Sequence, residues 1–494
     1  MRPNFLFILS DDQGAWAMRC AGNTDIFTPN LDRLATEGVR FENFYCASPV
    51  CSPARASILT GEMPSCHGVH DWLCRGNVNA DAHPYMQEHP HFQSHDIGIE
   101  YLEGHPSYIA ELAKNGYRCA LSGKWHLGNQ ENAKEGFTKW FTISGGGCGY
   151  YAADIFENGQ FTYCHDYITD VITDHALEYL DILEKEDAPF CLQVHYTAPH
   201  SPWTPENHPQ KYLDLYRDCA FTATPDEPMH KYQQTSAPLG DTPERRRENL
   251  TGYYAAISAM DANIGRILDK LERDGLADNT VVIFTADNGM NMGHHGVWGK
   301  GNGTYPPNMY DTSIKVPLLI RVPFLSKTGI TAQKSATHCD LFPTILDMAS
   351  AQYQLTDRQP GTSLYPYLKA GCPDTEENRI IEIHDEYGFV RMLRNNRYKL
   401  VRRYRWNDAE LYDMLEDPAE TVNRISDPAL QDVVAEMTAQ LEEWFKKYSD
   451  PHCDGRNSLT LTGSGQQDLC WKEDAFAHWN KMYHTGQDLL EVTP

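Results

Sequence analysis

The 494-residue sequence lacks an apolar run of transmembrane length, an internal repeat and a low-complexity tract. These absences exclude a membrane-spanning chain and a repeat array. A secretory leader with an apolar region and a cleavage site is also missing before the first strand-like run, which begins at Asn4. We therefore expect a cytoplasmic protein without a membrane partner.

Positive charge is scarce, because 42 Lys and Arg residues stand against 68 Asp and Glu and leave a net charge of −26. The one basic block, Arg245–Arg247, is expected to solvate the start of a helix. This balance excludes a broadly basic nucleic-acid-binding surface, so no nucleic-acid partner is expected. If the protein acts on an anion, its positive side chains must gather in the binding pocket.

A disulfide framework is absent as well. The fourteen cysteines are scattered along the chain without a regular spacing. A chain of this length can bury a sizeable core without covalent cross-links. We therefore expect reduced thiols.

Two buried strand-like runs end in acidic or amide residues. Asn4–Ser10 is followed by Asp11 and Asp12, and Thr280–Ala286 is followed by Asp287 and Asn288. Residues just past the carboxyl ends of strands form the active-site rim of an open α/β sheet. Each pair taken alone also fits a helix N-cap. Together they form an all-oxygen ligand set, which favours Ca²⁺, with Mg²⁺ as the less favoured ion, over zinc.

The segment Cys51-Ser52-Pro53-Ala54-Arg55 places a thiol immediately before a predicted helix start. Ser52 can cap that helix, and Pro53 suits its first position, where no N–H partner is needed. The free N–H groups of the first turn and the fork of Arg55 then favour an anion beside Cys51. The competing interpretation is a buried cysteine before an ordinary capped helix.

Four segments resemble the signatures of type I sulfatases, a family of the alkaline-phosphatase-like superfamily, and they occur in the family's order. The C-x-P-x-R pattern from Cys51 is followed by Leu-Thr-Gly, as in that family. The other matches are Gly123–Gly128, Ala198–Pro202 and Trp298–Gly301. Where some family members have a serine that contacts the leaving group, this chain has a glycine-rich run after Ser144, and the role of Ser144 stays open.

The resemblance implies a role for each matching residue. Cys51 would be oxidised to formylglycine by a formylglycine-generating maturation enzyme, and Arg55 would hold it or an oxyanion. Lys124 and His126 would contact the sulfate and the formylglycine, and Lys300 would be the second sulfate lysine. His200 would face the leaving oxygen. The implied metal ligands are Asp11, Asp12, residue 51, Asp287 and Asn288.

The implied activity is hydrolysis of a sulfate monoester of a sugar, aryl or steroid alcohol, either small or part of an oligosaccharide, through a formylglycine hydrate. Two alternatives stay open. One is a phosphomonoester or phosphonate monoester hydrolase of the same superfamily, because a tetrahedral anion site separates sulfate from phosphate poorly. The more remote one is an anion-binding protein without catalysis.

The alternation of buried strands with helical stretches predicts an α/β fold. We expect a large doubly wound mixed sheet flanked by helices over residues 1–370 and a smaller antiparallel sheet with a helix over 371–494, packed as one body. Helices are predicted at 28–37, 169–186, 244–273 and 427–448, and strands of the second sheet at 379–384, 389–393 and 398–404.

Two groups of residues are predicted at the mouth of the site. The histidine-rich segment 81–96 is interpreted as a surface loop over the mouth rather than as a zinc site. Aromatic side chains suit stacking on a sugar or an aryl group, namely Trp72, Tyr150, Tyr151 and Trp203.

Overall fold

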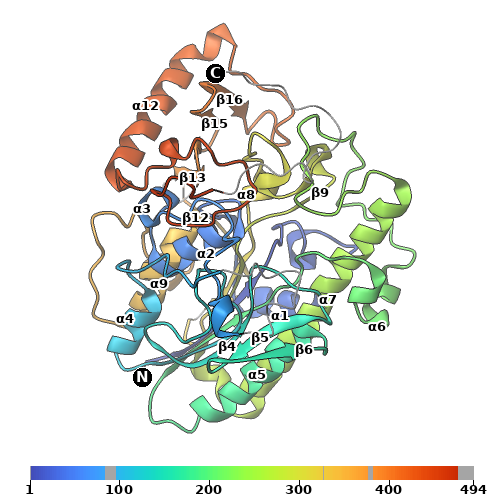
Figure 1. Cartoon of the computed structure of the whole chain (residues 1–494), viewed down its shortest axis with the longest axis vertical. Helices are drawn as coiled ribbons and strands as arrows, with labels where there is room; N and C mark the ends of the chain where they lie inside the picture. Colours follow the sequence, from blue (N-terminus) through green and yellow to red (C-terminus); the bar gives the residue numbers. More distant parts are fainter. Residues whose placement is uncertain (1, 84–95, 326, 376–381, 477–494) are drawn as a thin grey trace.

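A ten-stranded sheet forms the centre of the computed structural model, which describes residues 2–83, 96–325, 327–375 and 382–476 (Figure 1). Of the nine pairs of neighbouring strands in this sheet, five are parallel and four are antiparallel. The predicted large mixed sheet is therefore confirmed. In spatial order its strands are β12 (Ile330–Thr337), β2 (Val39–Tyr45), β11 (Leu318–Arg321), β8 (Thr280–Ala286), β1 (Asn4–Ser10), β7 (Phe190–His195), β3 (Arg118–Lys124), β4 (Phe137–Ile143), β5 (Ala153–Glu157) and β6 (Gln160–Cys164).

Both faces of the sheet are covered by helices, so β1 is buried on both sides. Its alternate residues Phe5, Phe7 and Leu9 pack into one hydrophobic core, and Leu6 and Ile8 pack into the other. This two-sided burial explains why the sequence of β1 is apolar throughout rather than alternating. In Figure 1 one face carries α1 (Pro29–Glu37), α5 (Ile168–Leu183) and α7 (Pro243–Arg273), and the other carries α2 (Cys51–Thr60), α4 (Tyr108–Lys114) and α9 (Leu341–Met348).

The predicted helices of the large lobe agree with α1, α5 and α7 to within a few residues. Thr242 caps α7 by accepting a hydrogen bond from the Arg245 N–H, and Pro243 occupies its first turn. Within the described ranges, no helix combines the length and apolarity that a membrane crossing requires. The shorter elements are α3 (Pro64–His67), α6 (Gln210–Leu213), α8 (Asp311–Ile314), α10 (Tyr365–Lys369), β9 (Asn291–Met292) and β10 (Trp298–Gly299).

The second lobe is an antiparallel sheet with one long helix, as predicted. Its strands, in order, are β13 (Ile383–Tyr387), β14 (Val390–Arg394), β15 (Tyr398–Arg403) and β16 (Asp408–Asp413), and its helix is α12 (Gln431–Tyr448). The prediction lacked β16. The first strand was predicted at 379–384, whereas β13 begins at Ile383. Residues 379–381 lie outside the described ones. The helix begins later than predicted because Asp427 caps a separate turn over Pro428–Leu430.

A buried ion pair and a buried hydrogen bond join the two lobes. The fully buried ammonium of Lys399 in β15 lies 3.0 Å from an Asp311 carboxylate oxygen in α8 and 2.6 Å from one of Glu420. The buried guanidinium of Arg391 in β14 donates to the Ser65 hydroxyl of α3 at 2.8 Å. Because a buried charge needs a polar partner nearby, the contacts of Lys399 with Asp311 and of Arg391 with Ser65 fix one lobe against the other. The domain boundary near residue 370 stays a prediction.

Candidate active site

The site begins where β1 and β8 end side by side. The two strands are parallel and in register, with Ser10 opposite Ala286, so the residues that follow them meet at one sheet edge. The Asp12 N–H donates to an Asp287 carboxylate oxygen at 3.1 Å. The Asn288 amide donates to an Asp12 carboxylate oxygen at 2.9 Å. The predicted oxygen cluster is thus formed by backbone register alone.

Helix α2 brings Cys51 and Arg55 to the same edge. The helix begins at Cys51 itself, and its N-cap is Val50 without a side-chain cap bond. The predictions that Cys51 precedes the helix and that Ser52 caps it are therefore wrong. The Ser52 hydroxyl is occupied elsewhere, because it accepts a hydrogen bond from the Leu73 N–H at 3.1 Å.

Three buried cations face the acidic cluster. The Lys124 ammonium lies 2.6 Å from Asp11, and the Arg55 guanidinium lies 2.8 Å from Asp287. Lys300 pairs with Asp12 and also lies 3.2 Å from the Cys51 sulfur. The scarce positive charge of this acidic protein is thus concentrated at one point, as predicted.

Burial and these cations set the protonation of the cluster. Burial by itself raises the pKa of Asp287, but Arg55, Lys124 and Lys300 outweigh it and hold that pKa well below its usual range. Burial, followed by repulsion from Asp287, raises the pKa of Asp11 to about 6. Burial also raises the pKa of the Cys51 thiol, although Lys124 and Lys300 oppose it. The unmodified thiol is therefore a weak nucleophile here.

The donor set fits a hard divalent cation. One carboxylate oxygen of Asp11 and the amide oxygen of Asn288 are buried and have no hydrogen-bond partner. Ligand atoms of Asp11, Asp12 and Cys51 lie within 4.8 Å of one another. Buried acceptors without donors are costly, and an oxygen-seeking ion would satisfy them. Asp11, Asp12, Asp287 and Asn288 could hold such an ion.

Two histidines border the cluster with defined tautomers. His126 Nε2 lies 3.1 Å from the Leu73 carbonyl oxygen, and His200 Nδ1 lies 2.8 Å from that of Ser201. A carbonyl oxygen only accepts, so these nitrogens carry the protons. The other nitrogens face the site. His126 Nδ1 is buried without a partner, and His200 Nε2 lies 3.8 Å from an Asp12 carboxylate oxygen.

The glycine run after Ser144 has a steric cause. A Cβ at Gly146 would lie 2.2 Å from His126 Cε1, and one at Gly147 would lie 3.2 Å from His200 Cε1. Residue 146 must therefore be glycine for the chain to pass this close to His126. The Ser144 hydroxyl is buried and has no hydrogen-bond partner.

The aromatic predictions need correction, because two of the four rings are structural. Tyr150 is buried and donates its hydroxyl proton to the His200 carbonyl, and the buried Trp203 donates to the Pro199 carbonyl. Both rings hold the His200 loop instead of lining a mouth. Trp72 is half-buried and Tyr151 is exposed. In the segment 81–96, residues 84–95 lie outside the described ones.

One residue of the site was missed by the sequence analysis. His195, the last residue of β7, lies with Nδ1 3.1 Å from the Lys124 carbonyl oxygen, to which Arg55 also donates. Burial, aided by Arg55, lowers its pKa to about 3, so it is neutral. A single histidine at the end of a buried strand carries no sequence signature beyond its position next to β1.

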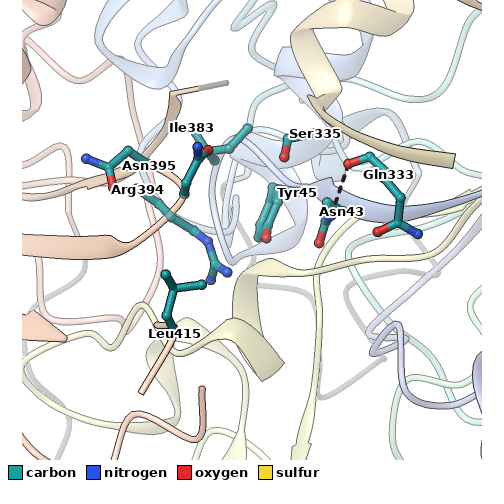
Figure 2. Close-up of a pocket in the computed structure, with 9 residues that line it drawn as sticks. Asn43, Tyr45, Gln333, Ser335, Ile383, Arg394, Asn395 and Leu415 are labelled. Carbon is teal, nitrogen blue, oxygen red and sulfur yellow. Dashed lines mark hydrogen bonds between the residues drawn. The ribbon is translucent and has the colours of Figure 1, made fainter. Parts of the chain in front are cut away.

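Two other features lie apart from this cluster. A pocket of about 380 Å³ lies at the seam of the lobes. Figure 2 shows Asn43 and Tyr45 of β2 among its lining residues, with Arg394 and Leu415 from the second lobe. None of the predicted site residues lines it. An exposed acidic group, formed by Asp181, Glu184 and Asp274, already contains the Lys270 ammonium between two of its members.

Comparison with known proteins gives consistent matches. Residues 3–351 match the family Sulfatase, and residues 293–447 match N-sulphoglucosamine sulphohydrolase, C-terminal. The chain is 29% identical to an N-acetylglucosamine-6-O-sulfatase of Bacteroides thetaiotaomicron, over 94% of this chain and 89% of that protein. It is 28% identical to a choline-sulfatase of Rhizobium meliloti, over 86% of this chain and 83% of that protein.

A solved structure is similar over nearly the whole chain. It is a complex of a protein with its substrate D-glucosamine-2-N,6-O-disulfate, and its sequence is 28% identical to this chain. The superposition has a TM-score of 0.74 and covers 92% of this chain and 99% of the other.

The metal site gives a test that does not depend on turnover. After exhaustive dialysis against a chelator, added Ca²⁺ should raise the melting temperature, because an ion that binds only the folded state stabilises it. Asp11→Asn keeps the shape of the side chain but removes its charge, and it should weaken Ca²⁺ binding by about tenfold or more in calorimetric titration.

The matched control is Asp181→Asn in the exposed acidic group, which should bind Ca²⁺ with unchanged affinity. Equal affinities in the wild type and Asp11→Asn, or zinc in stoichiometric amount in the purified protein, would contradict the calcium site.

Proposed function

Because this chain belongs to the sulfatase family and is therefore a sulfuric ester hydrolase, we propose that it removes the 6-O-sulfate of an amino sugar. The nucleophile is a formylglycine made from Cys51. The observation that carries this proposal is the cluster in which Cys51, Lys300 and Asp12 meet at the end of β1.

The substrate class is supported by two similar proteins. The Bacteroides relative is named for the 6-O-sulfate of N-acetylglucosamine, and the similar structure holds a glucosamine that is sulfated at the 2-N and 6-O positions. The half-buried ring of Trp72, whose Nε1 is held by the Gly463 carbonyl at 3.1 Å, offers a flat apolar surface of the kind on which sugars stack.

The cations of the site bind the sulfuryl group. Lys124, Lys300 and Arg55 carry positive charge to the point where negative charge grows as the ester bond breaks. Their carboxylate partners fix each cation in place before substrate arrives, so little reorganisation is needed. A calcium ion held by Asp11, Asp12, Asp287 and Asn288 would add Lewis-acid stabilisation of the same charge.

The nucleophile must be released after sulfur transfer, which a thiolate cannot achieve by itself. If residue 51 is formylglycine, its hydrate would offer one hydroxyl as the nucleophile toward sulfur and a second whose deprotonation would release sulfate and restore the aldehyde. His126 is the base for that second step. Burial, with repulsion from Lys124 and Arg55, holds its pKa well below the usual range, so the ring is neutral and its Nδ1 can accept a proton.

His200 is the general acid. Its Nδ1 proton is held by the Ser201 carbonyl, so in the imidazolium form, in which both ring nitrogens carry protons, Nε2 gives its proton to the departing alcohol and the ring is left neutral. Its side chain is 27% exposed, which keeps it in exchange with solvent for reprotonation. A sugar 6-hydroxyl is a poor leaving group, so this proton is needed.

The two alternatives make different predictions. A phosphate ester hydrolase would prefer the phosphate of the same alcohol, because the doubly charged group attracts the three cations more strongly. An anion-binding protein would show no turnover. A choline-sulfate hydrolase is the second sulfatase candidate, favoured only by the Rhizobium relative.

A panel of three esters separates these functions. Formylglycine-converted enzyme should hydrolyse N-acetylglucosamine 6-sulfate with a kcat/KM roughly tenfold or more above that for N-acetylglucosamine 6-phosphate and for choline sulfate. Released sulfate or phosphate is measured by ion chromatography. A preference for the phosphate ester would establish the superfamily alternative, and a preference for choline sulfate would refute the amino-sugar assignment.

The acid role of His200 is tested with two leaving groups. His200→Ala should lower kcat on N-acetylglucosamine 6-sulfate by about 10²-fold or more and on nitrophenyl sulfate much less, because nitrophenolate leaves without a proton. The exposed His165→Ala is the control and should leave both rates unchanged. Equal losses on both substrates in His200→Ala would mean that His200 positions the sulfate, and the acid would then be Lys300.

A further inference from the structure

Two cysteines far from the nucleophile meet beside Gly68. A Cβ at Gly68 would lie 3.1 Å from the Cys470 sulfur and 3.2 Å from the Cys453 sulfur, so both sulfurs contact the same small residue. Cys453 is buried and Cys470 is half-buried, and both are free in the structure.

Cys470 lies in a segment downstream of Cys453 that we call the hook, residues 458–476. In Figure 1 it is part of the red stretch that returns toward α3. Gln466 is its anchor. The backbone of Gln466 donates to the Trp72 carbonyl at 2.7 Å and accepts from the Cys74 N–H at 2.9 Å, and its buried amide bonds Gly68 and His70. The hook is thus paired along one edge with residues 68–74.

Residues 68–74 in turn support the active site through Leu73. Its N–H donates to the Ser52 hydroxyl in the first turn of α2, and its carbonyl accepts from His126 Nε2. Leu73 therefore fixes both the residue after the nucleophile and the tautomer of His126. An interaction that keeps the hook docked therefore also stabilises residues 68–74 and their contacts with Ser52 and His126.

We propose that Cys453 and Cys470 are a redox modification site, at which a low-molecular-weight disulfide such as glutathione disulfide oxidises the two thiols to a protein disulfide, which closes the loop between them and stabilises the docking of the hook on residues 68–74. The half-exposed Cys470 thiolate attacks one glutathione sulfur and releases a glutathione thiolate. The Cys453 thiol then displaces the second glutathione and loses its proton to solvent. Two protein thiols are oxidised, and one glutathione disulfide is reduced to two thiols.

The surroundings favour this pair over the others in the chain. Cys119 and Cys191 also lie opposite each other, on β3 and β7, but both are fully buried in the centre of the sheet, where no oxidant reaches them. Gly68 has no side chain to separate the sulfurs of Cys453 and Cys470, and its φ of +74° is one that glycine adopts without strain. Closing the loop between the two cysteines restricts the unfolded hook, which stabilises the docked form.

The test measures disulfide formation and amide hydrogen exchange rather than sulfate release. Its failure is therefore distinguishable from failure of the proposed sulfatase activity. Reduced protein is equilibrated with glutathione disulfide and digested without reductant. The expected product is a peptide pair joined through Cys453 and Cys470. Amide hydrogen exchange in residues 70–74 and 463–470 should slow by roughly tenfold or more in the oxidised protein.

Cys470→Ser should abolish both the linked peptide and the slowing of exchange. Cys219→Ser, at a half-buried cysteine of the large lobe, is the matched control and should retain both. Glutathione adducts without the linked peptide would overturn the proposed site. A linked peptide that leaves exchange in residues 70–74 unchanged would overturn the proposed support of the active site.

Discussion

The parallel pairing of β1 with β8 is the constraint on which the rest of the structure depends. It sets Ser10 opposite Ala286 and so brings Asp11, Asp12 and Asp287 to one edge of the sheet. Three carboxylates this close repel one another and cannot stay charged without counter-ions. Lys124 at the end of β3, Arg55 in α2 and Lys300 after β10 supply the positive charge, each from a different element. The positions of Lys124, Arg55 and Lys300 therefore meet one electrostatic requirement, the balancing of these carboxylates.

Several buried polar atoms at the carboxyl end of β1 and β8 have no hydrogen-bond partner within the protein. The partnerless oxygens of Asp11 and Asn288 point to a cation, and the free Nδ1 of His126 points to a proton acceptor. In each case the rest of the side chain is already fixed. The carbonyl oxygens of Leu73 and Ser201 accept from His126 and His200, so backbone groups of the protein fix the orientation of both rings.

Much of this was predictable from the sequence, because buried parallel strands have a clear signature. The apolar run of β1 and that of β8, each ending in an acidic or amide residue, indicated both the sheet and the oxygen cluster. The failures came where a side chain has a partner far away in sequence. Ser52 does not cap α2 because Leu73 binds its hydroxyl, and Trp203 lines no mouth because it holds the His200 loop. The glycine run had no explanation until His126 was seen against Gly146.

The central claim is that residue 51, once converted to formylglycine, is the group that takes sulfate from the substrate. The most direct test is to prepare the enzyme with graded amounts of a formylglycine-generating enzyme and to quantify conversion at residue 51 by peptide mass spectrometry. Sulfate release from N-acetylglucosamine 6-sulfate by the same samples is then measured. The rate should rise in proportion to the converted fraction and extrapolate to zero at no conversion. A substantial rate in protein whose Cys51 is wholly unmodified would contradict the claim.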